Sequence, residues 1–560
     1  MSALAKIADE LLDVIAQEDP LNEFIQGLSG YDHLLSDHDE AAEDRLRARA
    51  LRIATAAGEL GPSEPDWVTQ AVVKQQANAV ADRIDARLVE HTMADYLVSP
   101  IARLLTMVPL ARPIGVEQER GYLRRLATIP DYLAKVSARH RSGMATGRLP
   151  IAERARYAIS RLDSYLSDTA HDPFRGAVLT GSRAAERDRL LEDAVRPAFA
   201  AYRDVLETDI APHGRSPEQV GLCWLPDGEA AYAALTRVHT TTDRTPEQLH
   251  RTGLELIEQL AEEYVAIGSS VFGVRTVAEV HHRLRTDPAL RWGSAAELMA
   301  SAQASIDRAE GAAPDWFGQL PSHGCVLEPT PEADAPNAAA AWYSPPTLDG
   351  SRPGTYLVNT HRATERDRSV AEALTFHEAV PGHHLQVTVA QELAKLPQLR
   401  RLVLINSYSE GWGLYAERLA DEMGLYSDDI ARLGMLAMDS TRAARLVVDT
   451  GLHAFGWSRQ RVVDYLRSNT VMSEVEIQSE TDRYIEMPGQ ALSYMVGRLE
   501  IQRLRTRAEK KLGAAFDVRA FHDLVLGGGA LPMAVLDDVV ADWTAKVTAP
   551  RPRHTKLPLP

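Results

Sequence analysis

The chain has 560 residues, of which 45% are hydrophobic and 25% charged, with a net charge of -17 and two cysteines. This is the composition of an ordinary globular protein. The negative charge argues against nucleic acid or an anionic membrane surface as a partner. Two cysteines are too few for a disulfide scaffold or a thiolate metal site. Charged residues interrupt the apolar runs of Met1–Leu12, and no segment reaches the roughly 18 apolar residues of a membrane span, so we expect a cytoplasmic protein. The sequence makes no prediction of the oligomeric state.

Most of the chain has the apolar spacing of amphipathic helices, which predicts a mainly α fold. Pro197 is expected to kink or divide one of these helices, because proline gives no backbone N–H. Thr245–Gln248 predicts another helix start, with Thr as N-cap, Pro at the first position and Gln closing a capping box. In chain order the other helical stretches are Ile84–Val98, Glu117–Thr128, Glu186–Leu206 (with Pro197), Ser294–Ala309, Leu399–Ile405, Ala431–Val448 and Gly489–Lys511.

Proline and glycine cluster between Gly311 and Gly354, a pattern that favours loops and short strands over helix. Gly354–Thr360 follows them with β-branched and aromatic residues and predicts a strand. A break near Pro212–Pro217 divides a helical N-terminal region, 1–215, from a catalytic region, 216–560. A single interwoven fold over 1–560 is the alternative.

A candidate metal site lies at His377-Glu378-Ala379-Val380-Pro381-Gly382-His383-His384. Ser369–Glu372 predicts, as a capping box, the start of the helix that carries His377. Zinc hydrolases often use H-E-x-x-H, since histidines four apart point the same way along a helix. Here the position of the second histidine is Pro381.

On an unbroken helix neither following histidine can share an ion with His377. His383 lies about 9 Å along the axis and about 240° around it, and His384 lies about 10.5 Å away. Pro381 gives no N–H to the preceding turn, and Gly382 permits backbone angles closed to other residues. A broken turn there brings one of the two histidines back to the metal, and the residues alone leave the choice between them open.

A third ligand is expected from the segment Ser409–Glu417. Glu410, beside a glycine near a helix start, is the candidate ligand, and Glu417, two turns on, is the candidate hydrogen-bond partner of a ligand. Two histidines and a carboxylate suit one zinc ion and leave a position for water. Glu378 then accepts the proton of that water. Core packing of these side chains is the alternative, but three histidines and a glutamate within eight residues around Pro-Gly favour a metal site.

The same residues carry a family resemblance. Thr375–Gln386 resembles the signature of the bacterial domain of unknown function 885 family, which is similar to gluzincin-type zinc metallopeptidases such as carboxypeptidase Taq and the thimet-type oligopeptidases. The matching segments lie in order over about 190 residues and are Tyr343–Asn359 (with Asp349-Gly350-Ser351-Arg352-Pro353-Gly354), Ser409–Glu417, Val448–Trp457, Pro488–Tyr494 and Phe521–Pro532.

The resemblance implies a two-lobed helical fold that encloses a deep central channel, with a small β-sheet near the active site. It implies His383 as the second zinc ligand, places His384 behind it, and supports Glu410 as the third. The family's substrates do not follow, because the family is named for an unknown function.

Peptide hydrolysis also needs a group that stabilises the oxyanion. The peptidases that this chain resembles use a downstream Tyr or His, so His453, Tyr484 and Tyr494 are the candidates. Each of the three is alternatively a packed residue with a satisfied polar tip. For His453, a helix-surface ladder with Arg445 and Asp449 is a further alternative.

Substrate contacts are expected from two sources. In gluzincins a strand placed like Gly354–Thr360 pairs with the substrate, which puts Tyr356 and Asn359 beside it; the edge of a small sheet is the alternative. Arg352 and Arg498 are candidates to bind a substrate carboxylate, and ordinary ion pairing is the alternative.

These observations lead to one hypothesis, a zinc metallopeptidase acting on short peptides. Glu378 activates a water on zinc held by His377, His383 and Glu410. Two rivals remain: a zinc amidase or esterase on a non-peptide substrate, and a non-catalytic helical binding protein whose metal is structural.

Overall fold

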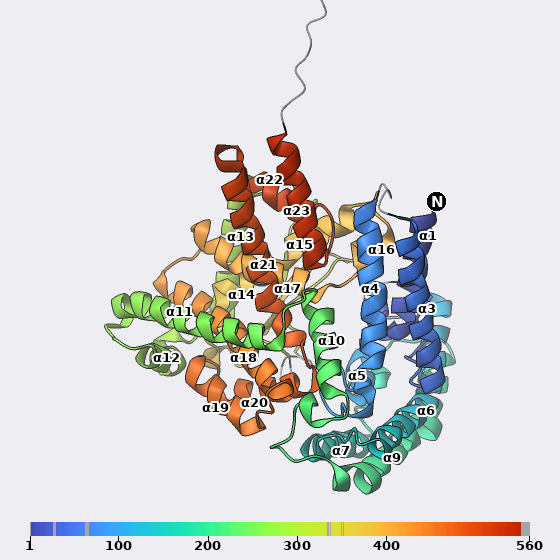
Figure 1. The fold of residues 1–560 in the computed structure, drawn as a ribbon. Coiled ribbons are helices and arrows are strands. Elements are labelled where there is room, and N and C mark those ends of the chain that lie inside the picture. The colour runs from blue at the N-terminus through green and yellow to red at the C-terminus, as the bar shows by residue number, and fades with distance from the viewer. Residues whose placement is uncertain are drawn as a thin grey trace, which may run out of the picture.

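The computed structural model describes residues 2–25, 28, 30–61, 66–332, 335, 338–348, 350 and 352–549. Asp349 and Ser351 of the segment expected to carry part of the family resemblance lie outside these residues. The N-terminal helices stand on one side of the molecule and curve across its base (Figure 1). They are α1 (Ala3–Glu18), α2 (Pro20–Ile25), α3 (Glu40–Glu59), α4 (Trp67–Asp85), α5 (Pro100–Met107), α6 (Gly115–Ala145), α7 (Ala152–Ser167), α8 (Arg183–Leu190) and α9 (Arg196–Val205).

The later helices fill the rest of the molecule, with α21 and α23 rising beside α13 in Figure 1. They are α10 (Gly228–Thr240), α11 (Pro246–Phe272), α12 (Val277–Thr286), α13 (Ala295–Trp316), α14 (Ala371–Glu378), α15 (His383–Glu392), α16 (Gln398–Leu402), α17 (Asn406–Glu422), α18 (Asp429–His453), α19 (Arg459–Asn469), α20 (Glu474–Glu486), α21 (Ser493–Leu512), α22 (Val518–Leu526) and α23 (Met533–Thr548). The predicted mainly helical fold is confirmed. Among the described helices, none is long and apolar enough to cross a membrane.

The strands of the described residues form one small sheet in the order β1-β3-β2. They are β1 (Val326–Pro329), β2 (Ala341–Ser344) and β3 (Thr355–Val358). β3 pairs in parallel with β1 and antiparallel with β2, so the strand predicted at Gly354–Thr360 exists and is central. Its partner β2 is an edge strand and contacts α14.

Several helix predictions are confirmed and others are wrong. The capping box at Thr245 and Gln248 opens α11 as expected. Ile84–Val98 is wrong, because α4 ends at Asp85 and the chain then follows a short 3-10 turn and irregular backbone. The start of the Gly311–Gly354 segment is also helical, since α13 continues to Trp316 through Pro314.

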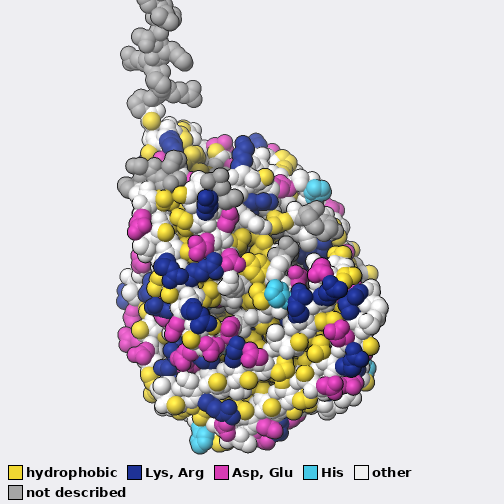
Figure 2. Space-filling model, turned by 90° about the vertical axis from the view of Figure 1, so that its right-hand side faces the viewer, with side chains coloured by type: hydrophobic (Ala, Val, Ile, Leu, Met, Phe, Trp, Pro, Cys, Tyr) yellow, Lys and Arg dark blue, Asp and Glu magenta, His cyan; other side chains and the backbone are white. Residues whose placement is uncertain are grey.

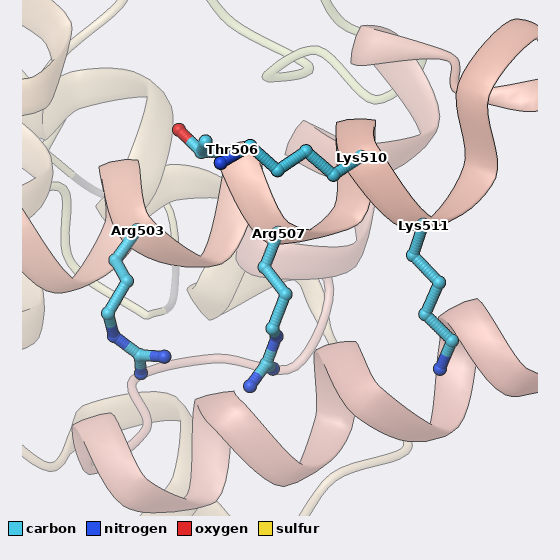
Figure 3. Close-up of a pocket in the computed structure, with 5 residues that line it drawn as sticks. All are labelled: Arg503, Thr506, Arg507, Lys510 and Lys511. Atoms are coloured by element: carbon cyan, nitrogen blue, oxygen red, sulfur yellow. The ribbon is translucent and has the colours of Figure 1, made fainter.

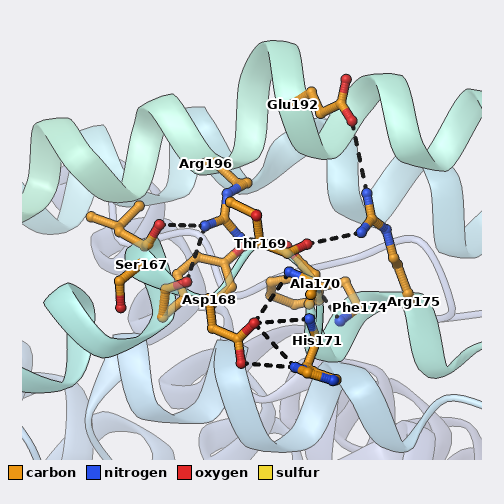
Figure 4. A network of polar contacts seen from close by, with 12 residues as sticks. Ser167, Asp168, Thr169, Ala170, His171, Phe174, Arg175, Glu192 and Arg196 are labelled. Carbon is orange, nitrogen blue, oxygen red and sulfur yellow. Dashed lines mark hydrogen bonds and ion pairs between the residues drawn. The ribbon is translucent and has the colours of Figure 1, made fainter.

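Pro197 lies where the helix Arg183–Ile210 changes winding, as expected. A π-helical turn, Leu191–Val195, precedes it, so the hydrogen-bond pattern of the helix changes just before the proline, which has no N–H to donate. The neighbouring Arg196 donates to the carbonyl oxygens of Tyr165 and Leu166, which ties α9 to the end of α7 (Figure 4). The π turn therefore sits in a fixed part of the N-terminal region.

Hydrophobic clusters cross the boundary expected near residue 215. Val72 of α4 packs in one cluster with Phe376 of α14. Ala86 shares another with Leu436 of α18, and Leu399 of α16 lies in the cluster formed by α1, α3 and α4. The division into 1–215 and 216–560 stays a prediction, and these contacts are those expected of an interwoven fold.

The chain has a net charge of -17, but its acidic side chains do not form one continuous patch on the face shown in Figure 2. Acidic and basic side chains alternate there with hydrophobic ones between them. Such a surface favours solubility rather than long-range steering of a charged partner.

Candidate metal centre

The helix that carries the first histidine, α14, begins without the predicted cap. Its N-cap is Val370, and the Ser369 hydroxyl donates to Asp367 at 2.9 Å instead. Glu372 faces other elements, because its carboxylate accepts the Ser427 N–H at 2.9 Å and binds Arg308 at 2.6 Å. The predicted capping box is therefore wrong, and tertiary contacts position the start of α14.

The predicted helix break at Pro381-Gly382 is confirmed. α14 ends at Glu378 and α15 begins at His383. Gly382 has φ -84° and ψ -129°, and a Cβ there would lie 1.9 Å from the carbonyl oxygen of His377. A residue of α17 holds this turn, since the Trp412 indole N–H donates to the Pro381 carbonyl at 2.9 Å.

The break brings His377 and His383 together with Glu410 of α17. Each of the three offers a ligand atom, and these atoms lie within 4.8 Å of one another. Both imidazole Nε2 atoms lie 3.6 Å from one oxygen of Glu410. Ligands at about 2.0–2.1 Å from a tetrahedral zinc ion lie roughly 3.3 Å apart. The separations are therefore too long for good hydrogen bonds and close to those of ligands around one ion.

Glu417, which is also on α17, binds Nδ1 of His377, whereas Glu410 lies beside Nε2 of the same ring. The distance from its carboxylate to Nδ1 of His377 is 2.7 Å, and Glu417 is fully buried. Burial alone lowers the pKa of His377, but its interactions with the Glu410 and Glu417 carboxylates outweigh burial and raise the pKa to about 10. Burial raises the pKa of Glu410, and its interactions with the two histidines hold the pKa below its ordinary value. The cluster thus attracts positive charge.

His384 points away from the other two histidines. Its Nδ1 is 3.0 Å from the Tyr343 hydroxyl and its Nε2 is 3.0 Å from the His323 carbonyl oxygen. With both nitrogens engaged and 1% of the residue exposed, it braces α15 against the sheet. The structure thus puts His383, not His384, beside His377.

Glu378 lies between the metal cluster and the small sheet. Its carboxylate accepts the backbone N–H of Tyr343 in the edge strand β2 and lies near His377 and His383. Burial raises the pKa of Glu378, the direction expected of a carboxylate that exchanges protons near neutral pH. Sequence reasoning missed Tyr343 and β2. The aromatic pair in Ala341–Ser344 was the available signal for a strand.

Two glycines bring α17 and α21 into backbone contact beside the cluster. A Cβ on Gly411 would lie 2.5 Å from the Gly497 backbone, and one on Gly497 would lie 1.8 Å from the Ser407 carbonyl oxygen. The crossing puts Tyr494, one turn before Gly497, near Glu410. Burial raises the pKa of Tyr494 and the charge of Glu410 adds to the rise. Tyr494 is therefore the one of the three oxyanion candidates that the structure brings to the cluster.

The other two candidates are engaged elsewhere. His453 is fully buried, its Nδ1 accepts the Leu222 N–H at 3.1 Å and its Nε2 lies 2.9 Å from the Tyr484 carbonyl oxygen. The Tyr484 hydroxyl donates to Glu480 at 2.6 Å and accepts from Arg445 at 3.0 Å. Both residues hold helices together, and neither is among the converging ligands, so the structure gives their predicted catalytic roles no support.

The strand expected to bind substrate has no free edge, because β3 pairs with a neighbour on both sides. Tyr356 is 2% exposed with its hydroxyl 3.4 Å from Thr375, and the Asn359 amide donates to the Ala335 and Ala338 carbonyls. These contacts do not support the substrate roles expected of Tyr356 and Asn359, which stay predictions. The edge next to Glu378 belongs to β2.

The two expected carboxylate-binding arginines differ from each other. Arg352 is exposed and donates to the Pro345 carbonyl at 3.1 Å. Arg498 is 5% exposed and pairs with Asp439 at 2.5 Å, and Asp439 also binds Arg418. The ion pair with Asp439 is the alternative expected for Arg498, and its substrate role stays a prediction.

Replacing Gly413 with Ala is expected to displace the first histidine. The new Cβ would lie 2.5 Å from Cε1 of His377, whose Nδ1 is held by Glu417. Overpacking of this kind costs about 1–3 kcal/mol, so we expect a lower thermal midpoint and weaker zinc binding. Gly311→Ala in α13 is the control, since its Cβ meets nothing within 4 Å and the helix gains about 1 kcal/mol. Equal midpoint shifts in the two variants would contradict the close approach.

Comparisons with known proteins place the chain in a family. Residues 20–540 match the model of DUF885, a bacterial protein family of unknown function. The fold is similar to the crystal structure of a putative lipoprotein from Colwellia psychrerythraea, with 27% identity, a TM-score of 0.88, and 97% of this chain and 99% of that chain covered. A putative lipoprotein from Shewanella oneidensis has the same fold, with 17% identity, a TM-score of 0.77, and 97% and 100% covered. No curated protein matches. The family expected from Thr375–Gln386 is thereby confirmed, and the chain belongs to DUF885.

Proposed function

We propose that the protein is a zinc-dependent hydrolase that cleaves short peptides. The observation that carries the proposal is the convergence of His377, His383 and Glu410 within 4.8 Å. Their donors are two imidazoles and one carboxylate, a set that catalytic zinc sites use. The Glu417 carboxylate on the far nitrogen of His377 is the usual outer partner of a zinc-binding histidine.

The charges of the cluster also fit a divalent cation. Glu378, Glu410 and Glu417 surround two imidazoles in a largely buried space. Carboxylates so placed are costly unless a cation balances them. Zinc suits this mixed nitrogen and oxygen set better than magnesium or calcium, which prefer oxygen ligands alone.

The protein's own residues divide the work of hydrolysis. When bound, zinc lowers the pKa of a coordinated water and polarises the substrate carbonyl. Glu378 accepts the proton of the attacking water and later gives it to the leaving amine. Tyr494, on the helix that crosses α17 beside Glu410, donates its hydroxyl proton to the developing oxyanion. β2 is an edge strand, and an extended peptide that pairs with it would lie next to Glu378.

A two-lobed fold around a deep channel, as in gluzincin peptidases, is part of this proposal. It rests on the resemblance of the His377–His384 and Ser409–Glu417 segments to those peptidases. The cytoplasmic location stays a prediction. Because the two structural neighbours are described as lipoproteins, cell fractionation with an antibody to the native protein is the direct measurement.

Two measurements test the function. Metal analysis of the zinc-repleted protein should find one zinc ion per chain. Mass spectrometry of an unbiased peptide pool should then show zinc-dependent cleavage, while ester and acyl-amide panels stay unchanged. A preference for those panels would favour the amidase or esterase rival. A protein without stoichiometric zinc would refute the proposal.

Glu417→Gln is expected to weaken zinc binding by about 10- to 100-fold, because the amide is a poorer partner for Nδ1 of His377. Competition with a zinc chelator measures the change. Glu422→Gln at the exposed end of the same helix is the control and should bind zinc normally. Wild-type affinity in Glu417→Gln would show that the 2.7 Å contact does not support the metal.

A further inference from the structure

Three buried arginines lie at Tyr494 or next to the arginine that packs on it. Arg442 and Arg445 come from α18 and Arg483 from α20, and they are 9%, 8% and 7% exposed. The guanidinium carbons of Arg445 and Arg442 lie 4.5 Å and 5.9 Å from the centre of the Tyr494 ring. Arg483 joins them through Glu480, which binds both Arg445 and Arg483. We call these three residues the arginine cluster.

The arginine cluster has more positive than negative charge. Glu480 binds Arg445 at 2.9 Å and Arg483 at 2.8 Å, so it serves two of the three. Within the described part of the chain, no carboxylate pairs with Arg442. Arginine is rarely buried without such a partner, because its charge loses hydration. The surplus is notable in a chain whose net charge is -17.

The arginine cluster also has donors to spare. Arg442 Nη1 reaches only the Met438 carbonyl at 3.4 Å and the Met438 sulfur at 3.1 Å, both on its own helix. Buried Nε of Arg442 and Nη1 of Arg445 have no hydrogen-bond partner among the described residues. Arg503 and Arg507 of α21 differ, because both point toward α23 (Figure 3) and pair with Asp537.

The acidic groups near the arginine cluster are committed to other partners. Glu410 binds the two histidines. Asp449 accepts the Tyr232 hydroxyl at 2.6 Å and the Gly489 N–H at 3.1 Å, and burial raises its pKa to about 7. Neither can neutralise Arg442, so an anion from outside the chain is the group that suits this place.

Tyr494 connects the arginine cluster to the metal centre. Its ring packs against Arg442 and Arg445, and its helix touches α17 at Gly411, the residue next to Glu410. Arg442 thus packs on a tyrosine whose helix crosses α17 beside Glu410. For a peptide that lies across Tyr494, the group that reaches the arginine cluster is close to the bond being cut.

We propose that the arginine cluster, with Arg442 as its main donor, binds the free α-carboxylate of the peptide substrate. The inference rests on the proposed function and makes it more specific: cleavage takes place near the C-terminus of the peptide. A guanidinium fits a carboxylate with two parallel N–H···O bonds. An acidic side chain of the substrate offers the same chemistry, so the experiment separates the two sources.

The test measures peptide binding by calorimetry to the zinc-loaded Glu378→Gln protein, which needs no turnover. Three probes are compared: an apolar tetrapeptide with a free C-terminus, the same peptide as its C-terminal amide, and the amide with one aspartate side chain. We expect the free acid to bind about 10- to 100-fold more tightly than the amide, the range of charge-assisted hydrogen bonds. The aspartate-containing amide should bind like the plain amide.

Arg442→Gln in the same background should reduce the preference for the free acid to less than about threefold. Arg507→Gln, which removes a paired surface arginine, should keep it. The thermal midpoint separates a binding role from a structural one. The midpoint of Arg442→Gln should match or exceed that of the parent, because no carboxylate loses its partner. The midpoint of Arg445→Gln should be lower, because Glu480 loses one of its two arginine partners.

The outcomes distinguish a failure of this inference from a failure of the proposed hydrolase function. If peptides are cleaved but acid and amide bind equally, the carboxylate role is wrong and the hydrolase stands. If the aspartate-containing amide binds as tightly as the free acid, the arginine cluster recognises side chains instead. If the free acid is preferred through Arg442 but no peptide is cleaved, the binding site stands and the hydrolase falls. If no probe binds, the inference is refuted.

Discussion

Glu378→Gln should lower peptide hydrolysis by about 10²- to 10⁴-fold, the usual contribution of a general base. The amide keeps the shape of the side chain and still accepts the Tyr343 N–H, but it takes no proton from water. Zinc content should stay at one ion per chain, because Glu378 is not among the converging ligands. Initial rates on a cleaved peptide, with metal analysis of the same sample, give both numbers.

Glu365→Gln is the matched control for this variant. Glu365 lies shortly before α14 and forms a surface pair with Arg362, a contact worth little to stability or catalysis. It should turn over at the wild-type rate. Wild-type turnover in Glu378→Gln would remove Glu378 as the base, and loss of zinc would show that it binds the metal.

His383→Ala and His384→Ala form the second decisive pair, since they change neighbouring histidines with opposite expected results. His383→Ala removes one of the three converging ligands. Zinc affinity should fall by more than the roughly 10- to 100-fold that the loss of an outer hydrogen-bond partner costs. Activity should fall with it. Chelator competition and metal analysis measure the affinity and the stoichiometry.

His384→Ala should instead keep its zinc and lose stability. The change leaves the Tyr343 hydroxyl and the His323 carbonyl without their partner. Two hydrogen bonds of this kind together contribute about 1–3 kcal/mol, so their loss lowers the thermal midpoint. Zinc retained by His383→Ala and lost by His384→Ala would exchange the roles of the two histidines.

The features that sequence predicted well at this site are local. Pro381 and Gly382 act on the turn that contains them, so a helix break and a returning histidine follow from backbone chemistry alone. Glu410 and Glu417 were predictable because their spacing on one helix sets which residues share a face. The choice of His383 over His384 needed either the resemblance or the structure, because it depends on how far the turn rotates.

The features that sequence missed depend on contacts between distant segments. Ser369 fits the capping-box pattern, yet Asp367 takes its hydroxyl. The order β1-β3-β2 removes the free edge from β3, and nothing in Gly354–Thr360 shows which neighbours will flank it. His453 and Tyr494 were equal candidates in the sequence. Only the helix crossings decide that one is sealed in the core and the other meets Glu410.

The contact between Gly411 and Gly497 also matters for anyone who transplants this centre. Because no side chain separates the two helices, their spacing is a property of the main chain and survives changes in the surrounding sequence. A designed scaffold would therefore need two closely crossed helices to carry Glu410 and Tyr494, joined to a broken helix that carries the histidines. Such a framework sets the distance between metal and hydroxyl before any active-site residue is chosen.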